Sequence, residues 1–154
     1  MREHHLTGGA LAGEGRLEVP PLQFVERDGK SAVMIFYVGS DLCGHAGLVH
    51  GGAMATLLDE ALARCCFQAL PNKVGMTANL KIDYRRPMPA GSFAVIKCVT
   101  TGVEGRKAWV RGTLESLPGK GEEGVVYCEA EALFIEPKEA AVSFLGFGSY
   151  LERG

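Results

Sequence analysis

The apolar pattern of residues 51–69 predicts a long helix at the centre of the fold. Good helix formers fill this stretch without a break, and the helix is expected to end before Pro71. Gly51 and Gly52 open it and let the backbone come close to whatever lies above the helix start. A helix that is apolar nearly all round is typical of a core. The first residue to explain is therefore Asp59, because a carboxylate there is costly unless it is paired, solvated or used.

The segments before the helix predict one strong strand. Residues 32–38 (AVMIFYV) are rich in β-branched and aromatic side chains, as in a buried strand. The sequence Asp28-Gly29-Lys30 just before them is a hairpin-like turn signal. Residues 6–16 are expected to form a loose lead-in or a short helix, which Pro20-Pro21 ends. Residues 39–49 are expected to form a glycine-containing loop that leads into the helix.

After the helix the apolar positions recur at every second residue, which predicts strands. Residues 74–84 alternate in this way; the apolar members are Met76, Ala78, Leu80 and Ile82, and the polar members are Thr77, Asn79, Lys81 and Asp83. Three further strands are expected at residues 92–103, 108–117 and 125–135, each separated from the next by a short turn. Beyond Pro137, residues Phe144-Leu145-Gly146-Phe147 are expected to pack on the body of the protein or on a partner.

This order of elements predicts a single α+β domain over residues 1–154, with a core at about 20–137 and a flexible lead-in and tail. The chain is 47% hydrophobic, which is enough for a sizeable core. A strongly curved antiparallel sheet would cover the long apolar helix on most sides. The outer edges of such a sheet stay open, which favours dimerisation by edge pairing or by packing of helix faces.

Charge and composition narrow the classes of function. The formal net charge is -2 and there is no basic block, so bulk nucleic-acid binding is not expected, although a local cluster could hold phosphates. Five cysteines without paired spacing favour a reducing compartment, either the cytoplasm or the mitochondrial matrix. No apolar run is long enough to cross a membrane, and no integral membrane segment is expected. The first residues lack the features of a signal or transit peptide.

Helical geometry relates Asp59 to the start of its own helix. Asp59 lies seven residues after Gly52 and eight after Gly51, so at about 100° per residue it returns to the face of the helix start. The N–H groups of Gly51 and Gly52 are first-turn donors that can hold a developing oxyanion, and a carboxylate can act as general base or nucleophile. The two ends lie about 11–12 Å apart along the axis, too far to act on one carbonyl. The site is therefore expected to join the helix start of one subunit to Asp59 of another.

Structural explanations compete with these roles. Asp59 could be a buried acid that is hydrogen-bonded to a neighbouring Thr or Asn. His50 is expected to donate a hydrogen bond to a backbone carbonyl rather than to act in a triad, because no Ser or Cys lies beside it with that logic. No metal site is expected, since the four histidines and scattered cysteines show no zinc spacing. The glycine-rich segments match neither a phosphate loop nor a dinucleotide fingerprint.

The motif His50-Gly51-Gly52 followed by Asp59 resembles that of the PaaI-type hotdog-fold thioesterases. The resemblance covers roughly residues 40–135 and looks closest to the thioesterase superfamily member 4/5 branch and its fungal relatives. Three segments carry it in register: residues 47–59 (GLVHGGAMATLLD), 76–87 (MTANLKIDYRRP) and 103–107 (VEGRK).

The resemblance implies a hotdog fold, a homodimer or a tetramer of two dimers, and a thioester hydrolase that converts acyl-CoA to free acid and CoA without metal or cofactor. Asp59 matches the catalytic acid, Thr77 the hydroxyl residue that helps to hold water, Gly51 the donor to the thioester oxygen, and His50 the residue that shapes the turn. The expected substrate contacts are Gly52 at the helix start and, toward the CoA part, Asp83, Arg85, Arg106 and Lys107. Without the resemblance, those charged residues would be read as a solvated strand end and turn.

Two positions depart from the family pattern. Some relatives carry Asn or Gln about six residues before the histidine as a second polariser of the carbonyl, and here that place is Gly44, beside His45. The oxyanion site would thus use backbone donors alone, or His45 would assist. Asp83 replaces an amide that is common in the branch.

Two other functions fit the same resemblance. One is a non-catalytic acyl-CoA-binding or regulatory protein, because a fold does not fix a function. The other is a thioesterase that acts on acyl or polyketide chains bound to a carrier protein, which shares the phosphopantetheine arm but lacks the nucleotide. The intact pair of Asp59 and Thr77 favours catalysis.

Overall fold

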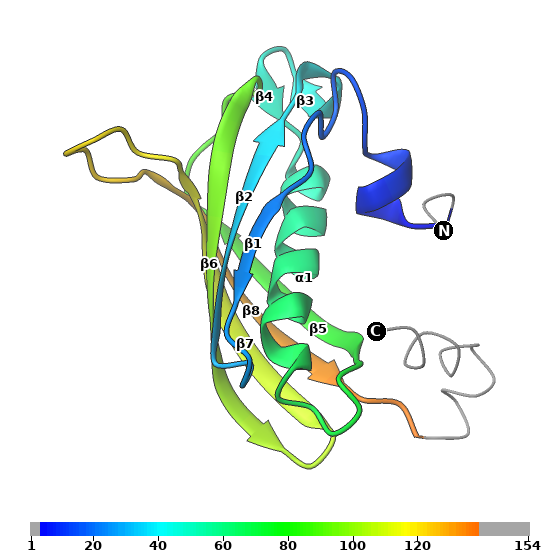
Figure 1. Ribbon diagram of the computed structural model, residues 1–154. Helices are drawn as coiled ribbons and strands as arrows, with labels where there is room; N and C mark the ends of the chain where they lie inside the picture. Colours follow the sequence, from blue (N-terminus) through cyan, green and yellow to red (C-terminus); the bar gives the residue numbers. More distant parts are fainter. Residues whose placement is uncertain (1–3, 139–154) are drawn as a thin grey trace.

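The computed structural model describes residues 4–138, which form a curved antiparallel sheet with one long helix in its concavity (Figure 1). Helix α1 spans Gly51–Phe67, close to the predicted range. The sheet has the strand order β1-β2-β6-β7-β8-β5, so β1 and β5 are its edges. The strand bounds are Leu22–Val25 (β1), Ser31–Val38 (β2), Met76–Tyr84 (β5), Ser92–Glu104 (β6), Lys107–Ser116 (β7) and Val126–Ile135 (β8). The predicted α+β architecture is confirmed.

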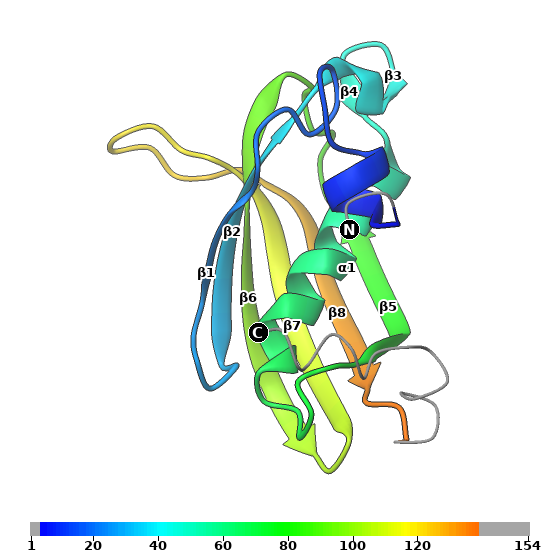
Figure 2. The same ribbon diagram turned by 45° about the vertical axis from the view of Figure 1, so that its right-hand side comes forward.

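The core lies between the concave face of the sheet and one side of α1 (Figure 2). The helix buries its residues on that side, namely Met54, Leu57, Leu58, Ala61, Leu62, Cys65 and Cys66. The largest fully buried strand residues are Met34, Phe36, Ile96, Leu114 and Phe134. The opposite side of α1 is half-exposed, so the helix is covered on fewer sides than its composition predicts.

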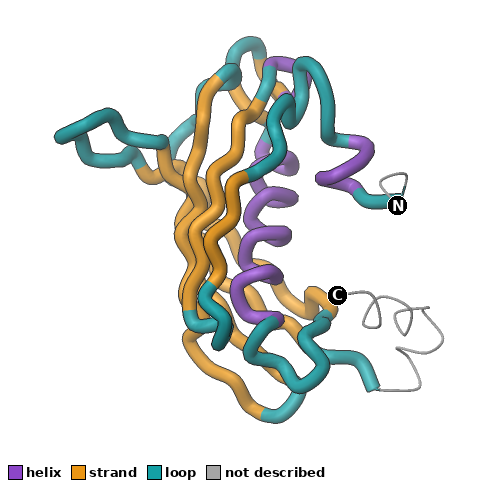
Figure 3. The backbone as a smooth tube through the Cα atoms, in the orientation of Figure 1, coloured by secondary structure: helices purple, strands orange, loops and turns teal. Residues whose placement is uncertain are grey.

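Several short elements of the structure are not predicted by the pattern of apolar and polar residues. Strand β1 pairs with β2 through a connection at residues 26–30, which contains the predicted turn at residues 28–30. The predicted loop at residues 39–49 contains a 3₁₀ turn, η2 (Ser40–Leu42), and a small hairpin of β3 (Cys43–His45) and β4 (Leu48–Val49). The lead-in contains one π-helical turn, η1 (Leu6–Ala10), which lies beside α1 (Figures 1 and 3). Strands of two to four residues are too short to show a period.

Strand β5 contains a bulge that corrects the predicted alternation. Thr77 pairs with Phe134 and Asn79 pairs with Leu133, so Ala78 is an extra residue in β5. The bulge shifts the phase of the strand. Thr77 therefore faces the helix, on the same side as Leu80, whereas strict alternation would place these two residues on opposite faces.

No helix within residues 4–138 has both the length and the apolarity required to cross a membrane. The five cysteines are all free thiols, and only Cys43 among them is not buried. The expected packing of residues 144–147 lies outside the described residues.

Candidate active site

Asp59 and Thr77 meet between α1 and the edge strand β5. The Thr77 hydroxyl donates a hydrogen bond to Asp59 Oδ1 over 2.8 Å. Asp59 is half-buried, and it takes part in none of the ion pairs formed by the described residues. The carboxylate is thus held by a neutral donor on one oxygen, while Oδ2 stays available to a further partner. A carboxylate with an orienting hydroxyl is suited to activating water or to attacking a carbonyl.

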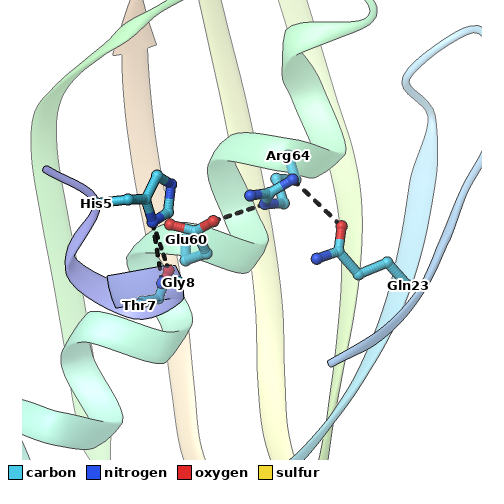
Figure 4. A network of polar contacts seen from close by, with 6 residues as sticks. All are labelled: His5, Thr7, Gly8, Gln23, Glu60 and Arg64. Carbon is cyan, nitrogen blue, oxygen red and sulfur yellow. Dashed lines mark hydrogen bonds and ion pairs between the residues drawn. The ribbon is translucent and has the colours of Figure 1, made fainter. Parts of the chain in front are cut away.

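The neighbouring acid, Glu60, has a different environment (Figure 4). Arg64, one turn further along the helix, binds Glu60 Oε1 through Nε at 2.6 Å and reaches the side chain of Gln23 on β1 at 3.3 Å. Successive residues of a helix point about 100° apart, so Asp59 faces β5 while Glu60 faces away from it. Glu60 is already paired with a cation and serves as a natural comparison for Asp59.

The helix start is shaped by His50. This residue is the N-cap, and its ring Nδ1 accepts a hydrogen bond from the Gly52 N–H over 2.8 Å. The N–H groups of Ala53 and Met54 bind the His50 carbonyl at 2.9 and 3.1 Å. The Gly51 N–H has no acceptor among the described residues. The prediction that the histidine ring donates to a carbonyl is therefore wrong, and the structure separates a free donor at Gly51 from an occupied one at Gly52.

Gly44 packs directly against His50. A Cβ atom at Gly44 would lie 3.1 Å from Cδ2 of the His50 ring and 3.2 Å from its Cα, closer than ordinary contact. An amide side chain at this position would therefore require His50 to move. His45 ends the short strand β3 and is exposed. Within residues 4–138, no group of three or more His, Cys, Asp or Glu side chains is placed to bind a metal ion.

The two chemical parts of the site lie at opposite ends of β5. Thr77 at the start of the strand holds Asp59, and the Tyr84 hydroxyl at its end donates to the Gly51 carbonyl over 2.7 Å. Along α1, the eight steps from Gly51 to Asp59 correspond to about 12 Å. Within one protomer, the structure therefore does not bring the free N–H and the carboxylate together. Tyr84 is not among the predicted site residues, although it shares a strand face with Ile82 and Leu80.

Asp83 and Arg85 lie away from Asp59, on the convex side of the sheet. Arg85 binds Glu129 at 2.8 Å, and this hydrogen bond raises the pKa of the guanidinium above its ordinary value. Asp83 lies 3.7 Å from the ammonium of Lys81. These residues line a groove of about 540 Å³ in which charges of both signs alternate. Within one protomer, Asp83 and Arg85, both predicted as substrate contacts, thus lie on the face of the sheet opposite to the helix.

Arg106 and Lys107 lie at the turn between β6 and β7. The guanidinium of Arg106 binds the carbonyl of Glu136 at 2.7 Å, and the Glu136 N–H returns a bond to the Arg106 carbonyl at 2.7 Å. The buried Glu136 carboxylate accepts two hydrogen bonds from Asn72, at 2.8 and 2.6 Å. Lys107 is exposed and aligns through β8 with the start of β5, where Thr77 lies. The turn between β6 and β7 thus lies at the same end of the sheet as Thr77 and the Asp59 carboxylate.

Comparison with known proteins places these features in a family. The protein-family model described as thioesterase superfamily matches residues 46–123. This match covers about half of the chain and includes the His50 turn and Asp59. An uncharacterised protein of Schizosaccharomyces pombe is 42% identical over 129 residues, which cover 84% of this chain and 73% of that protein. The acyl-coenzyme A thioesterase THEM4 of Mus musculus is 40% identical over 113 residues, 73% of this chain and 46% of that protein. A Candida albicans protein named as mitochondrial is 32% identical over 140 residues, 88% of this chain and 63% of that protein.

A solved structure shows the same fold. The phenylacetic acid degradation protein PaaI of Thermus thermophilus superposes with a TM-score of 0.64, at 23% identity, over 76% of this chain and 93% of that chain. This likeness confirms the predicted hotdog fold. The present chain spans about half the length of the mouse relative. On the match of the family model and of these relatives, the chain belongs to the thioesterase superfamily, with PaaI-like structural neighbours and fungal relatives, as the motifs predicted.

Proposed function

We propose that this protein hydrolyses acyl-CoA thioesters to a free acid and CoA. The observation that carries the proposal is the hydrogen bond from Thr77 to the half-buried Asp59, on the same helix as the Gly51 N–H. Within residues 4–138, Asp59 has no cationic partner and this N–H has no acceptor. A mouse relative is named an acyl-coenzyme A thioesterase, which supports this substrate class. The reaction needs a polarised carbonyl and an activated water or nucleophile, and these two groups can supply both.

The complete site forms across a dimer in this proposal. Strand β5 is a sheet edge whose outer side has no neighbouring strand among the described residues, so it can pair with a second copy of itself. Antiparallel pairing about a two-fold axis between Leu80 and Lys81, midway between Thr77 and Tyr84, brings the end of one β5 beside the start of the other. Because Tyr84 binds Gly51 and Thr77 binds Asp59, this pairing brings the partner's Gly51 toward Asp59.

The chemistry then divides between two subunits. The partner's Gly51 N–H holds the thioester oxygen, where negative charge develops as the carbonyl is attacked. Asp59, oriented by Thr77 through Oδ1, takes a proton from water with Oδ2, or attacks the carbonyl itself. In both routes the C–S bond breaks, and the thiolate of CoA leaves and is protonated. When water attacks, its oxygen joins the acyl carbon directly; when Asp59 attacks, a second step hydrolyses the acyl–Asp59 anhydride with water and releases the acid.

Basic residues at the carboxylate end would bind the CoA nucleotide. Lys107 is exposed near the start of β5, and Arg106 keeps further N–H groups beyond the one that binds Glu136. Both are suited to phosphate, and Asp83 and Arg85 remain proposed contacts with the CoA part. A Lys107→Ala variant should raise KM for acyl-CoA; unchanged turnover at low substrate would favour a carrier-protein substrate instead. Lys107 is the better target because Arg106 also supports Glu136.

Replacement of Asp59 tests the function directly. Release of free thiol from short-chain, medium-chain, long-chain and aryl acyl-CoAs is measured for the wild type and for Asp59→Asn. This change keeps an acceptor for Thr77 but removes the base, so activity should fall by roughly 100-fold or more while the dimer persists. Glu60→Gln is the matched control, since Glu60 is paired with Arg64, and it should retain activity. Full activity of Asp59→Asn, or binding without turnover by the wild type, would contradict the proposal.

The name of one relative supports a proposal on the compartment in which this protein acts. The Candida albicans relative is named as mitochondrial, so we infer that this protein acts in the mitochondrial matrix, with the cytoplasm as the alternative. Immunodetection in purified mitochondria with an intact inner membrane, before and after protease treatment, separates the two.

A further inference from the structure

Tyr84 reaches the peptide group that follows the free donor. Its hydroxyl donates to the Gly51 carbonyl over 2.7 Å, across 33 residues of sequence. The ring lies beside the same glycine, because a Cβ atom at Gly51 would be 3.6 Å from three atoms of Tyr84. A carbonyl oxygen has two lone pairs, so this bond adds to the one made within the helix. Burial raises the pKa of Tyr84 above its ordinary value, and the hydroxyl stays protonated as a donor at neutral pH.

The Gly51–Gly52 peptide group is thereby held at both of its polar atoms. Tyr84 binds its carbonyl, and the ring Nδ1 of His50 binds its N–H over 2.8 Å. The preceding peptide group is held through the His50 carbonyl, which accepts from the first helical turn. Two consecutive glycines have the widest backbone freedom of any pair. External hydrogen bonds are therefore the means by which this turn keeps one orientation of the Gly51 N–H.

The position of Tyr84 on the helix face depends on the same strand that holds the carboxylate. After the bulge at Ala78, Leu80, Ile82 and Tyr84 share the concave side. Strand β5 thus fixes both chemical parts of the site, Asp59 through the Thr77 hydroxyl and Gly51 through the Tyr84 hydroxyl.

We propose that Tyr84 is a positioning residue that fixes the direction of the Gly51 N–H for the thioester oxygen. The proposal rests on the proposed thioesterase function. Tyr84 does not touch the substrate in this role and acts through the peptide group. A correctly aimed N–H contributes mainly when charge develops on the oxygen, so loss of the clamp lowers kcat more than it changes KM.

The test compares Tyr84→Phe with the wild type. This change keeps the ring and removes one hydroxyl, and we expect kcat to fall about tenfold with KM changed less than about twofold. Tyr37→Phe is the matched control: Tyr37 packs on Phe93 on the convex side and its hydroxyl makes no hydrogen bond within the described residues. It should leave both constants unchanged.

A second readout separates positioning from a general structural role. Hydrogen bonds in series strengthen one another, so Tyr84→Phe should weaken the bond from Gly52 to His50 and move the Gly52 amide proton upfield in the NMR spectrum. The dimer, measured by light scattering, should persist. An unchanged kcat with an active wild type would overturn the role of Tyr84, whereas an inactive wild type would instead overturn the thioesterase function. A fall in kcat that is explained fully by a smaller fraction of folded protein would also overturn the positioning role of Tyr84.

Discussion

Thr77 reaches Asp59 because Ala78 changes the phase of β5. The hydroxyl then donates to one carboxylate oxygen over 2.8 Å and leaves the other free. Neither residue is placed in this way by local propensity. The contact joins a helix to an edge strand, and the sheet ladder controls its geometry.

Removal of the Thr77 hydroxyl should therefore lower the rate without unfolding the protein. Thr77→Val keeps the shape of the side chain but cannot donate, and we expect kcat to fall about tenfold or more. Thr77→Ser keeps the donor and should retain most of the activity. The measurement is steady-state hydrolysis of the best acyl-CoA from the panel. Equal activities of the Val and Ser variants would show that the hydroxyl has no part in the reaction.

The sequence predicted individual residues of the site unevenly. Asp59 was selected by its position inside an apolar helix, and Gly51 by helical geometry. The role of Thr77 came from the resemblance, because strict alternation would have placed its side chain away from the helix side that holds Leu80 and Ile82. The ring of His50 accepts a hydrogen bond rather than donating one, since the nearest backbone partner is an N–H of the next turn. Tyr84 could not be found, because its partner lies 33 residues away.

At the scale of elements, Gly112 on β7 lies where α1 packs against the sheet. A Cβ atom at Gly112 would lie 2.8 Å from the carbonyl oxygen of Lys97 and 3.0 Å from a methyl group of Leu62. Glycine at this position therefore sets the distance between the helix and the sheet. Because Leu62 is fully buried, it has little room to retreat.

Gly112→Ala should destabilise the fold by about 1–3 kcal/mol, as expected for overpacking of a filled core. Gly102→Ala on the neighbouring strand β6 is the matched control, because its Cβ atom would make an ordinary contact of 3.7 Å with Trp109. Urea unfolding gives the free energy of both variants. Similar values for the two would show that the helix can shift at no cost.

The buried thiols give the fold a stability that depends on pH. Burial raises the pKa of Cys66 on α1 from 9.0 to about 12, and that of Cys128 on β8 to about 11. Below about pH 9 both thiols are protonated in the folded and the unfolded chain, so their full contribution is present. Above about pH 9 the thiols of the unfolded chain lose their protons first. Each of the two thiols then lowers the free energy of unfolding by about 1.4 kcal/mol per pH unit, up to its pKa in the folded protein.

The free energy of unfolding should therefore fall steeply between about pH 9 and pH 11. Chemical denaturation at several pH values measures the slope. The double variant Cys66→Ala, Cys128→Ala should start from a lower stability but show a shallower fall. Cys43→Ala, at a partly exposed thiol, should keep the wild-type slope. An identical slope in the double variant would assign the alkaline loss to other groups.

Long elements were predictable and short ones were not. The helix and the five long strands carry periods that extend over many residues, and the structure places them near the predicted bounds. Strand β1 and the hairpin of β3 and β4 have two to four residues each, so tertiary pairing rather than local pattern defines them. The bulge in β5 was missed because alternation of residue types continues through it.

At the scale of the whole molecule, the proposed site requires two copies of the chain. This requirement follows from the arrangement of one helix and one strand, which hold the two parts of the site at opposite ends of β5. A single protomer would then have the complete set of residues but no complete site.

Co-expression of two inactive variants tests the shared site. Gly51→Pro removes the N–H, and proline suits a first helical position. The backbone of His50, at φ -61° and ψ 134°, already suits a residue before proline. When Gly51→Pro and Asp59→Asn chains pair at random, about half of the dimers contain one chain of each kind. Each mixed dimer keeps one of its two sites complete, so about a quarter of the wild-type activity should be recovered. Gly51→Ala, which keeps the N–H, should stay active. Lack of any recovery would place both groups in one protomer's site.

The contact of His50 with two glycines has a consequence for the evolution of the site. Its ring lies where a Cβ at Gly44 would come within 3.1 Å of Cδ2, and a Cβ at Gly52 within 3.0 Å of Nδ1. Substitutions at Gly52 and His50 are therefore expected to be epistatic, since the contact of Gly52 is with the imidazole. A Cβ at Gly44 would also lie 3.2 Å from the His50 Cα, which every substitution of His50 keeps. An amide side chain at Gly44 therefore cannot be introduced by a single mutation at no cost. In a combinatorial library, it should be recovered together with a change in the β3–β4 hairpin.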